Sequence, residues 1–296
     1  MRQAKVPMEY SGLTTDQMQT PSASTVASRW LVVTDLDGTL LDHAYDFSAA
    51  APLLRQLEQR GVPVVPCTSK TAEEVEQFQA SAGLSSPYIV ENGGAIHFPH
   101  PENWLLEIPH QPGPGGGFVV PLGWPGQRLR PLLDSLAAEL GTQFFALEDL
   151  SLEDLMARTG LSPTEAALAA RRRWSVPFVL GEDQAIEAVE ALAAARGLKV
   201  LQGNRFAHLI APGSDKGLAL AALRRADPRR RAVLALGDSP NDMALLDGAD
   251  HAIVIPGANG PHPRLRPAIS AGRYQLASAP HAVGWADAVA TWLALT

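Results

Sequence analysis

The sequence predicts an α/β protein whose core is a doubly wound, mostly parallel sheet, with an α+β cap domain inserted into it. Two observations predict this fold. Short apolar strands alternate with amphipathic helices up to residue 97 and again after residue 213. The intervening stretch groups its helices and strands without strict alternation. A chain of 296 residues is also long enough to build two cores.

The fold opens with the stretch Leu31–Leu41. Its apolar, β-branched start is typical of a buried strand, and it runs into Asp35, Asp37 and the turn residue Gly38. Two carboxylates one residue apart at the end of a buried strand repel each other and resist the loss of water. They are therefore expected where a cation or a reaction needs them.

The next segments repeat this pattern of strand, polar loop and helix. The expected elements are a helix over 49–60, a strand over 62–67, a helix over 72–82 and a third strand over 87–90. The carboxyl ends of parallel strands lie at one edge of a sheet. We therefore expect Asp35, Thr68 and Asn92 to meet at that edge.

The pattern changes after residue 97. Gly and Pro dominate 111–126, which is expected to be a loop without regular structure. Grouped helices and strands then indicate an α+β insert. The expected helices lie near 128–140, 151–159, 163–173 and 183–196, and the expected strands near 174–180, 198–202 and 206–211.

The doubly wound pattern resumes near residue 213. A helix is expected over 218–225, and a strand over 232–236 delivers the motif 237–242 to a helix that opens at 243–246. Both ends of the chain should therefore build one domain. The predicted parts are a flexible tail over 1–29, a catalytic core from 30–97 and 213–296, and a substrate-specificity cap over 98–212.

Composition restricts the class of function. A net charge of -7 argues against a nucleic-acid surface, since no basic excess is present to bind phosphates. The single cysteine, Cys67, is expected to be buried, and it fits a reducing cytoplasm. We expect a cytoplasmic protein, because we find neither a signal-peptide core nor the roughly 18 apolar residues of a membrane span.

The polar residues at the predicted strand ends supply what phosphomonoester hydrolysis needs: a nucleophile, cation shielding and an acid for the leaving alkoxide. Asp35 is the candidate nucleophile, and Asp37 the candidate acid and base. Thr68 and Lys216 can bind phosphoryl oxygens, and Lys216 should hold Asp35 ionised. The expected Mg²⁺ ligands are Asp35, the main-chain carbonyl of Asp37, Asp238 and Asp242.

Each motif alone has a purely structural explanation. The 35–39 segment is compatible with a turn or a calcium loop, the 237–242 segment with a capped turn, and Lys216 with a solvated lysine. Their order along the chain, each at a predicted strand end or helix start, favours one catalytic site.

Together these motifs resemble the haloacid dehalogenase superfamily of phosphatases. Residues 35–41 match its first motif, Thr68 its second, Lys216 its third and 237–242 its fourth. The long insert is similar to the α/β caps of its sugar-phosphatase branch. The resemblance implies a Mg²⁺-dependent phosphatase that works through an aspartyl-phosphate.

A narrower resemblance, to mannosyl-3-phosphoglycerate phosphatases, rests on four segments. Thr68-Ser69-Lys70-Thr71 resembles their Ser-Ser-Lys-Thr, where most superfamily relatives have Thr-Gly-Arg. The segments 91–94, 203–209 and 279–289 are also similar. The chain departs from the family at 174–178, which lacks the usual acidic residue, and at Asn204, which replaces a usual Gly. A glucosyl-3-phosphoglycerate substrate is therefore a near equal.

The implied substrate is a phosphorylated sugar-glycerate, whose product is a compatible solute. Its phosphate, carboxylate and hydroxyls call for cations and hydrogen-bonding groups, with Arg205 and Lys70 as the first choices. His208 is expected to be a hydrogen-bonded structural residue and Arg171–Arg173 a solvated helix end. The expected substrate contacts are Leu36, Ser69, Lys70, Asn92, Arg205 and Asn241.

Three alternatives stay open. A broad sugar-phosphate or sucrose-phosphate-like phosphatase and a phosphohexomutase share the phosphoaspartate chemistry. A non-catalytic sugar-phosphate binding module is the third, and the filled catalytic positions disfavour it.

Overall fold

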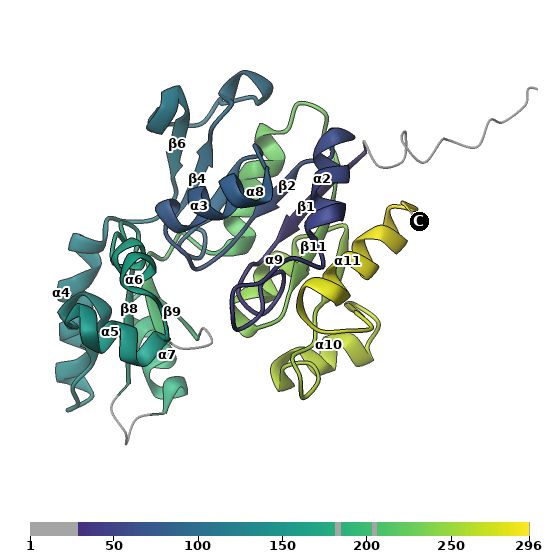
Figure 1. Ribbon diagram of the computed structural model, residues 1–296. Helices are drawn as coiled ribbons and strands as arrows, with labels where there is room; N and C mark the ends of the chain where they lie inside the picture. Colours follow the sequence, from purple (N-terminus) through teal and green to yellow (C-terminus); the bar gives the residue numbers. More distant parts are fainter. Residues whose placement is uncertain (1–28, 181–184, 203–205, 296) are drawn as a thin grey trace, which may run out of the picture.

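The structure, a computed structural model, describes residues 29–180, 185–202 and 206–295. Its central sheet has five parallel strands in the order β13-β12-β11-β1-β2 (Figure 1). These are β1 (Trp30–Thr34), β2 (Val64–Pro66), β11 (Ala232–Gly237), β12 (His251–Val254) and β13 (Gln275–Leu276). β1 lies between β2 and β11, so the two ends of the chain build one sheet, as predicted.

Helices cover both faces of this sheet because side chains alternate along β1. Val32 packs in the cluster of α2 (Ala51–Gln59), α3 (Ala72–Ala82) and α11 (His281–Trp292). Leu31 and Val33 belong to the opposite cluster, with α8 (Lys216–Ala226), α9 (Met243–Asp247) and α10 (Arg266–Ser270). The doubly wound architecture predicted from the sequence is confirmed.

The loop between β2 and α3 is fixed by the cap of the helix. The Thr71 hydroxyl accepts the Glu74 N–H, and the Glu74 carboxylate accepts the Thr71 N–H. α3 ends at Gly83, whose φ of 69° is left-handed. This capping box holds the short loop 67–71 at the carboxyl edge of the sheet.

The third predicted strand leaves the parallel sheet. β3 (Tyr88–Val90) pairs antiparallel with β4 (Ala95–Phe98), and a single parallel bridge joins Ile89 to Cys67 after β2. The chain reaches β3 from β2 through α3, which is the long crossover that a parallel neighbour needs, and the turn at 91–94 then returns it at once to β4. The expected third parallel strand is thus present only as this bridge, and the hairpin with β4 was not predicted.

The prediction of an irregular loop over 111–126 is also wrong. β5 (Gln111–Pro112) and β6 (Phe118–Pro121) form a hairpin there, and β6 pairs with β4. The glycines serve its turn, since Gly115 and Gly116 have φ of 62° and 86°. At Gly117 a Cβ would lie 2.6 Å from the Phe98 carbonyl oxygen, so that the hairpin can approach β4 only without a side chain.

A second antiparallel sheet, in the order β7-β8-β10-β9, lies beside the central sheet (Figure 1). Its strands are β7 (Phe145–Ala146), β8 (Ser175–Val179), β9 (Lys199–Gln202) and β10 (Ala207–Ile210). Leu133 of α4 (Gly126–Glu139) and Val189 of α7 (Ile186–Ala195) share its apolar core with Phe178 and Leu209. α5 (Leu152–Thr159) and α6 (Pro163–Ala169) pack in a smaller cluster.

The elements of this second sheet are those predicted for the insert, with two exceptions: the short strand β7 was not predicted, and α6 ends at Ala169 and not near residue 173. The division of the chain at 97/98 and 212/213 stays a prediction, and the first of these points falls within β4. Most of the predicted tail, together with Asn204 and Arg205, lies outside the described residues.

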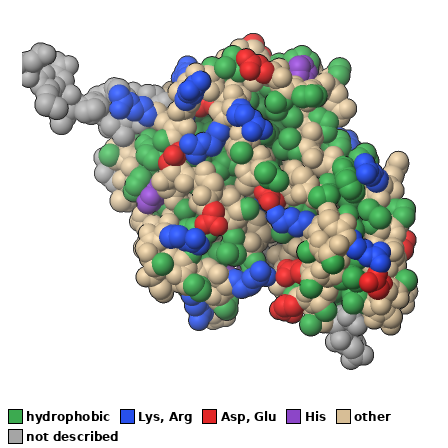
Figure 2. All heavy atoms as spheres, turned by 180° about the vertical axis from the view of Figure 1, so that it is seen from behind, with side chains coloured by type: hydrophobic (Ala, Val, Ile, Leu, Met, Phe, Trp, Pro, Cys, Tyr) green, Lys and Arg blue, Asp and Glu red, His purple; other side chains and the backbone are tan. Residues whose placement is uncertain are grey.

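No helix in the described part of the chain is both long and apolar enough to cross a membrane. On the face seen in Figure 2, acidic and basic side chains are interspersed among apolar and uncharged groups.

Candidate active site

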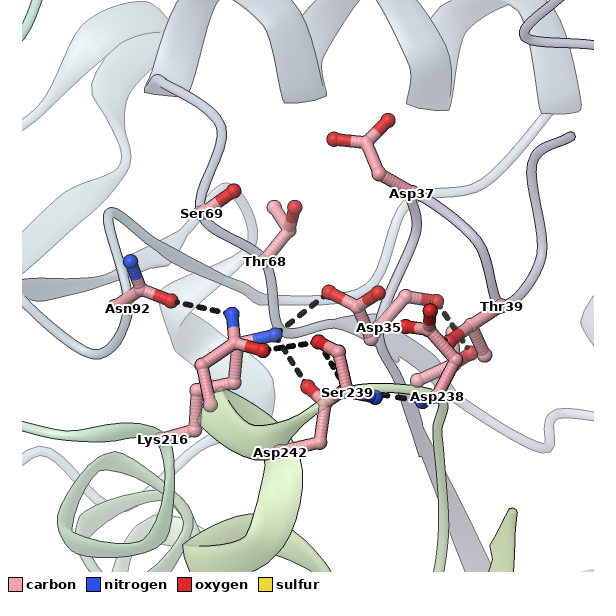
Figure 3. Close-up of polar contacts among 12 residues, drawn as sticks. Asp35, Asp37, Thr39, Thr68, Ser69, Asn92, Lys216, Asp238, Ser239 and Asp242 are labelled. Atoms are coloured by element: carbon pink, nitrogen blue, oxygen red, sulfur yellow. Dashed lines mark hydrogen bonds and ion pairs between the residues drawn. The ribbon is translucent and has the colours of Figure 1, made fainter. Parts of the chain in front are cut away.

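The ends of β1, β2 and β11 bring a set of polar side chains to one edge of the central sheet (Figure 3). Asp35 follows β1, and its N–H donates to the carbonyl of Leu236 in β11. Thr68 follows the end of β2 and is fully buried, and Asp238 follows β11. Asp35 and Thr68 therefore lie at the same edge of the sheet, as predicted, and Asp238 of the motif 237–242 joins them.

Lys216 stands at the centre of this group. Its fully buried ammonium lies 2.6 Å from Asp35 Oδ1 and 2.6 Å from Asp242 Oδ1 (Figure 3). Burial alone lowers the pKa of a lysine, but here the carboxylates of Asp242 and Asp35 raise the pKa above its ordinary value. Lys216 is therefore a permanent cation between two acids.

The local sequence around Lys216 explains how it reaches this position. Asp215 caps α8 by accepting the Leu218 N–H, so that Lys216 is the first residue of the helix. At Gly217 a Cβ would lie 2.5 Å from the Ala244 carbonyl oxygen. The glycine thus allows α8 to pack closely on α9, whose preceding turn carries Asp242.

Asp35, Asp238 and Asp242 form a cluster whose carboxylate oxygens lie within 4.8 Å of one another. Burial, opposed by Lys216 and assisted by the Asp242 charge, raises the pKa of Asp35 to about 7. Burial likewise raises the pKa of Asp238 well above its ordinary range, with Asp242 and Asp35 adding to the shift. One ammonium does not balance three acids, so the cluster fits a divalent cation with oxygen ligands, such as Mg²⁺.

The turn after β11 is built around Asp242. Its Oδ2 accepts the N–H groups of Asp238 and Ser239, each at 3.0 Å. At Gly237 a Cβ would lie 2.5 Å from the Asp242 Cβ, so this position needs a glycine. Because Asp242 is held on both sides, its carboxylate orients the turn and the Lys216 ammonium together.

Asn92 and Asn241 connect the turns that follow β3 and β11. Asn241 Nδ2 donates to Asn92 Oδ1 at 3.0 Å, while the buried Asn92 Nδ2 has no hydrogen-bond partner in the described structure. Gly93 packs so closely on the Asp215 backbone that a Cβ would lie 2.2 Å from its carbonyl oxygen. The Asn92 amide is thereby placed at the edge of the site with a donor to spare.

Asp37 stands apart from the acid cluster (Figure 3). Its Oδ1 lies 3.1 Å from Lys70 Nζ, which is also 3.4 Å from Glu74 Oε1 and 4.3 Å from the Tyr45 ring centroid. Burial opposes the charge of Lys70, but Asp37 and Glu74 raise its pKa above the ordinary value. Lys70 is a charged partner of Asp37 at the rim of the site.

A cavity of about 220 Å³ opens over these groups, between the sheet edge and the inserted elements. The side of the cavity formed at the edge of the central sheet is lined by polar residues. The opposite side carries both polar and apolar residues. The lining residues include Asp35, Asp37, Ser69, Lys70, Ser239 and Asn241 on one side and Leu147, Leu155, Leu161, Arg172, Phe206 and His208 on the other.

Residues 32–108 match the family described as haloacid dehalogenase-like hydrolase. Over 266 residues the chain is 32% identical to a protein of Persephonella marina named glucosyl-3-phosphoglycerate/mannosyl-3-phosphoglycerate phosphatase, covering 88% of this chain and 95% of that one. The chain is a haloacid dehalogenase-like phosphatase. A protein of the same name from Methanococcoides burtonii is 33% identical over 264 residues, with the same two shares covered.

Solved structures of low identity share the fold of this phosphatase. A phosphatase of the haloalkanoate enzyme superfamily from Bacteroides thetaiotaomicron superposes with a TM-score of 0.64 at 16% identity, over 95% of this chain and 100% of that one. The sucrose-phosphatase of Synechocystis, in complex with sucrose and phosphate, gives 0.53 at 18% identity, over 89% and 98%. The predicted fold class, family and phosphatase activity are confirmed.

Sequence reasoning missed Arg172 in this phosphatase. The prediction of a solvated helix end at 171–173 is wrong for Arg172, since α6 ends earlier and Arg172 Nη1 donates to the Ser69 carbonyl at 2.8 Å. Its half-buried guanidinium lines the cavity. The strand predicted from residue 174 was the available signal. Because a strand begins directly after Arg173, the chain must turn at these arginines, and they need not lie on a solvated helix.

His208 is buried, as expected of a structural residue, but one of its ring nitrogens has no partner among the described residues. It is 4% exposed and lines the cavity, and its Nδ1 has no hydrogen-bond partner among the described residues. Burial, with the nearby Arg172 and Lys216 charges, lowers its pKa well below the usual range. It is a neutral imidazole, and the predicted hydrogen bond is missing at this nitrogen.

Three further sequence predictions have separate outcomes. The Leu36 side chain is fully buried in the core, so that its main chain alone can reach a substrate. Arg205 lies outside the described residues. Cys67 is buried as predicted, and burial raises its thiol pKa above the ordinary value, which leaves it unreactive.

Proposed function

We propose that this phosphatase uses Mg²⁺ to hydrolyse the phosphate esters of glucosyl-3-phosphoglycerate and mannosyl-3-phosphoglycerate, releasing the glycosylglycerate that serves as a compatible solute. The observation that carries the proposal is the likeness, over 95% of their length, to two proteins named for these substrates. The acid cluster and the buried Lys216 supply the chemistry that such a reaction needs.

In the proposed first step Asp35 attacks the phosphorus atom, and the bond between phosphorus and the leaving oxygen breaks. Lys216, 2.6 Å away, favours the ionised form of Asp35, and the Thr68 hydroxyl and the spare Asn92 donor bind phosphoryl oxygens. When bound to Asp35, Asp238 and Asp242, Mg²⁺ supplies charge shielding for the phosphoryl group. Asp37 gives its proton to the departing alkoxide.

In the second step Asp37 takes a proton from the water that attacks the aspartyl-phosphate. The new bond forms between the water oxygen and phosphorus, inorganic phosphate leaves, and the Asp35 carboxylate is restored. Asp37 suits both roles because it lines the cavity and stands outside the acid cluster. Its partner Lys70, at 3.1 Å, orients it.

Substrate recognition is proposed to come from the inserted residues 98–212, which act as the cap. Arg172 brings a cation into the cavity, where it can bind the glycerate carboxylate, and neutral His208 offers a hydrogen-bonding nitrogen. The predicted substrate contacts of Ser69, Lys70 and Asn241 lie on the opposite wall. A phosphorylated sugar-glycerate fits between these two sets of polar groups.

A substrate panel tests this function. Phosphate release is measured with Mg²⁺ or with EDTA for mannosyl- and glucosyl-3-phosphoglycerate, sucrose phosphate and simple hexose phosphates. The expected result is the highest kcat/KM for the glycosyl-3-phosphoglycerates and no turnover in EDTA. Sugar isomerisation without phosphate release would instead indicate a phosphohexomutase, a broad response a general sugar phosphatase, and no turnover at all a binding module.

The covalent step has its own test. Enzyme quenched in acid during turnover of a substrate labelled in its phosphate should carry the label on the peptide that contains Asp35. An Asp35→Asn variant treated in the same way should carry none. A labelled peptide elsewhere in the chain contradicts the assignment of the nucleophile.

A further inference from the structure

The turn that follows β3 contains a buried carboxylate that the proposed chemistry does not use. Glu91 is 2% exposed, and its φ of 49° places a residue with a full side chain in the left-handed region. Asn92 and Gly93 continue this conformation, with φ of 57° and 91°. Such backbone strain persists where the surrounding contacts hold it, and it often marks a functional site.

Among the described residues, the donors to the Glu91 carboxylate all belong to the cap segment 173–175. Oε1 accepts the N–H of Arg173 at 2.8 Å, and Oε2 accepts the N–H of Trp174 at 3.0 Å and the Ser175 hydroxyl at 2.7 Å. These donors form the segment that enters β8. Glu91 therefore ties the core turn to the first residues of a cap strand.

Close packing at the next glycine supports this connection. At Gly94 a Cβ would lie 2.3 Å from the Trp174 Cβ, so the cap segment rests directly on the turn. A charged acceptor with three donors, enclosed in this way, is among the strong hydrogen-bonding arrangements. The position of the cap segment is thus determined by Glu91 more than by the exposed groups around it.

The residue that this segment carries into the cavity is Arg172. It lies next to Arg173 in the chain, and its Nη1 donates to the Ser69 carbonyl at 2.8 Å and to the Ser175 hydroxyl oxygen at 3.4 Å. Ser175 is thus shared by Glu91 and Arg172. Displacement of the segment from Glu91 therefore moves the arginine relative to the loop after β2.

We propose that Glu91 is a positioning residue for substrate recognition. By holding residues 173–175 it places Arg172 at the cavity, and it thereby fixes the distance between the cap and the core that a glycosyl-3-phosphoglycerate requires. The part about the substrate rests on the proposed function. Glu91 touches neither the phosphoryl group nor the acid cluster in this scheme, so its loss should alter binding of a large substrate more than the chemistry.

The kinetic test compares two substrates in Glu91→Gln. Glutamine keeps the shape but replaces one acceptor oxygen with an NH₂ group, which faces donors of the cap segment. We expect KM for glucosyl-3-phosphoglycerate to rise about tenfold, the order of magnitude for losing a charge-assisted hydrogen bond. For p-nitrophenyl phosphate, which is too small to need the cap, kcat/KM should change less than about twofold.

Glu73→Gln is the matched control. Glu73 Oε1 also contacts this segment, through Arg173 Nη2 at 2.6 Å, but that guanidinium is 53% exposed and Glu73 accepts no main-chain N–H from it. Exposed ion pairs contribute little, so both substrates should keep their kinetic constants within about twofold. Equal losses on both substrates in Glu91→Gln, or the same split in Glu73→Gln, would overturn the positioning role.

Hydrogen–deuterium exchange tests the contact without any substrate. Exchange at the Arg173 and Trp174 amides should rise in Glu91→Gln, and less strongly in Ser175→Ala, while Glu73→Gln and the α3 amides match the wild type. Unchanged exchange in both Glu91→Gln and Ser175→Ala refutes the proposal. If the wild type leaves glycosyl-3-phosphoglycerates intact, the proposed function fails, and exchange still decides whether Glu91 holds the cap.

Discussion

Asp35→Asn should abolish phosphatase activity and at the same time stabilise the metal-free protein. The carboxylate of Asp35 is buried beside Asp242, and burial is the largest cause of its raised pKa. Asparagine keeps an oxygen for Lys216, which lies 2.6 Å away, but carries no charge. The variant therefore removes the proposed nucleophile and relieves an electrostatic cost.

The size of this gain follows from the pKa. Below pH 3.8 Asp35 is protonated in both the folded and the unfolded chain, so its charge does not affect stability. As the pH rises to about 7, the unfolded chain releases the proton first, and the free energy of unfolding falls. A rise of about 3 pKa units, from 3.8 to about 7, corresponds to about 4 kcal/mol above pH 7.

Urea denaturation in EDTA measures this difference. At pH 8 the Asp35→Asn variant should unfold at a clearly higher urea concentration than the wild type, and at pH 5 less than half of the gain should remain. Asp37→Asn is the control, because Asp37 is partly exposed and pairs with Lys70. A less stable Asp35→Asn variant at pH 8 would refute the electrostatic reasoning, and near-normal hydrolysis with Mg²⁺ would refute the assignment of the nucleophile.

Three other predictions concern neighbouring groups. Lys216→Met leaves two buried carboxylates without their ammonium and should lower the free energy of unfolding by about 3–5 kcal/mol at pH 7.5, measured by urea denaturation. An unchanged urea midpoint would contradict the contribution of the two ion pairs. Asp37→Asn should reduce kcat more for sugar phosphates than for p-nitrophenyl phosphate, whose leaving group needs no proton; the reverse order argues against its acid role. Burial lowers the pKa of His97 to about 4. As the pH falls from 6.5 to 4, the free energy of unfolding of the wild type should therefore fall by up to about 3 kcal/mol relative to that of His97→Phe. Melting temperatures of the two proteins that change equally across this pH range would exclude the effect.

The sequence was sufficient for the parts of the fold that depend on local pattern. The run Leu31–Val33 is apolar at every position and alternates between the two faces of the sheet, which is why a buried parallel strand was predictable. Lys216 and Asp242 were found because they stand in motifs next to a helix start and a strand end. Their contact, between residues 26 positions apart, was not predicted and is a finding of the structure.

Features that depend on particular turns were not predictable in this way. The return of the chain after β3 depends on three consecutive left-handed residues, beginning with Glu91, an unusual position for a residue with a side chain. The hairpin at 111–121 was hidden because the glycines that permit its turn are also the signal of irregular structure. Arg172 was misplaced because its partner, the Ser69 carbonyl, is 103 residues away and leaves no trace in local composition.

The turn at residues 91 and 92 contacts both the cap segment and the turn of the proposed catalytic site. Glu91 faces the cap segment 173–175, whereas Asn92 accepts from Asn241 in the turn that also carries Asp238 and Asp242. Both residues lie in one buried turn, with φ of 49° and 57°. The turn thereby places one side chain against the cap segment and the next beside the turn that follows β11. Loss of the Glu91 contacts should therefore act on the position of Arg172, while Asn241 continues to hold the Asn92 amide.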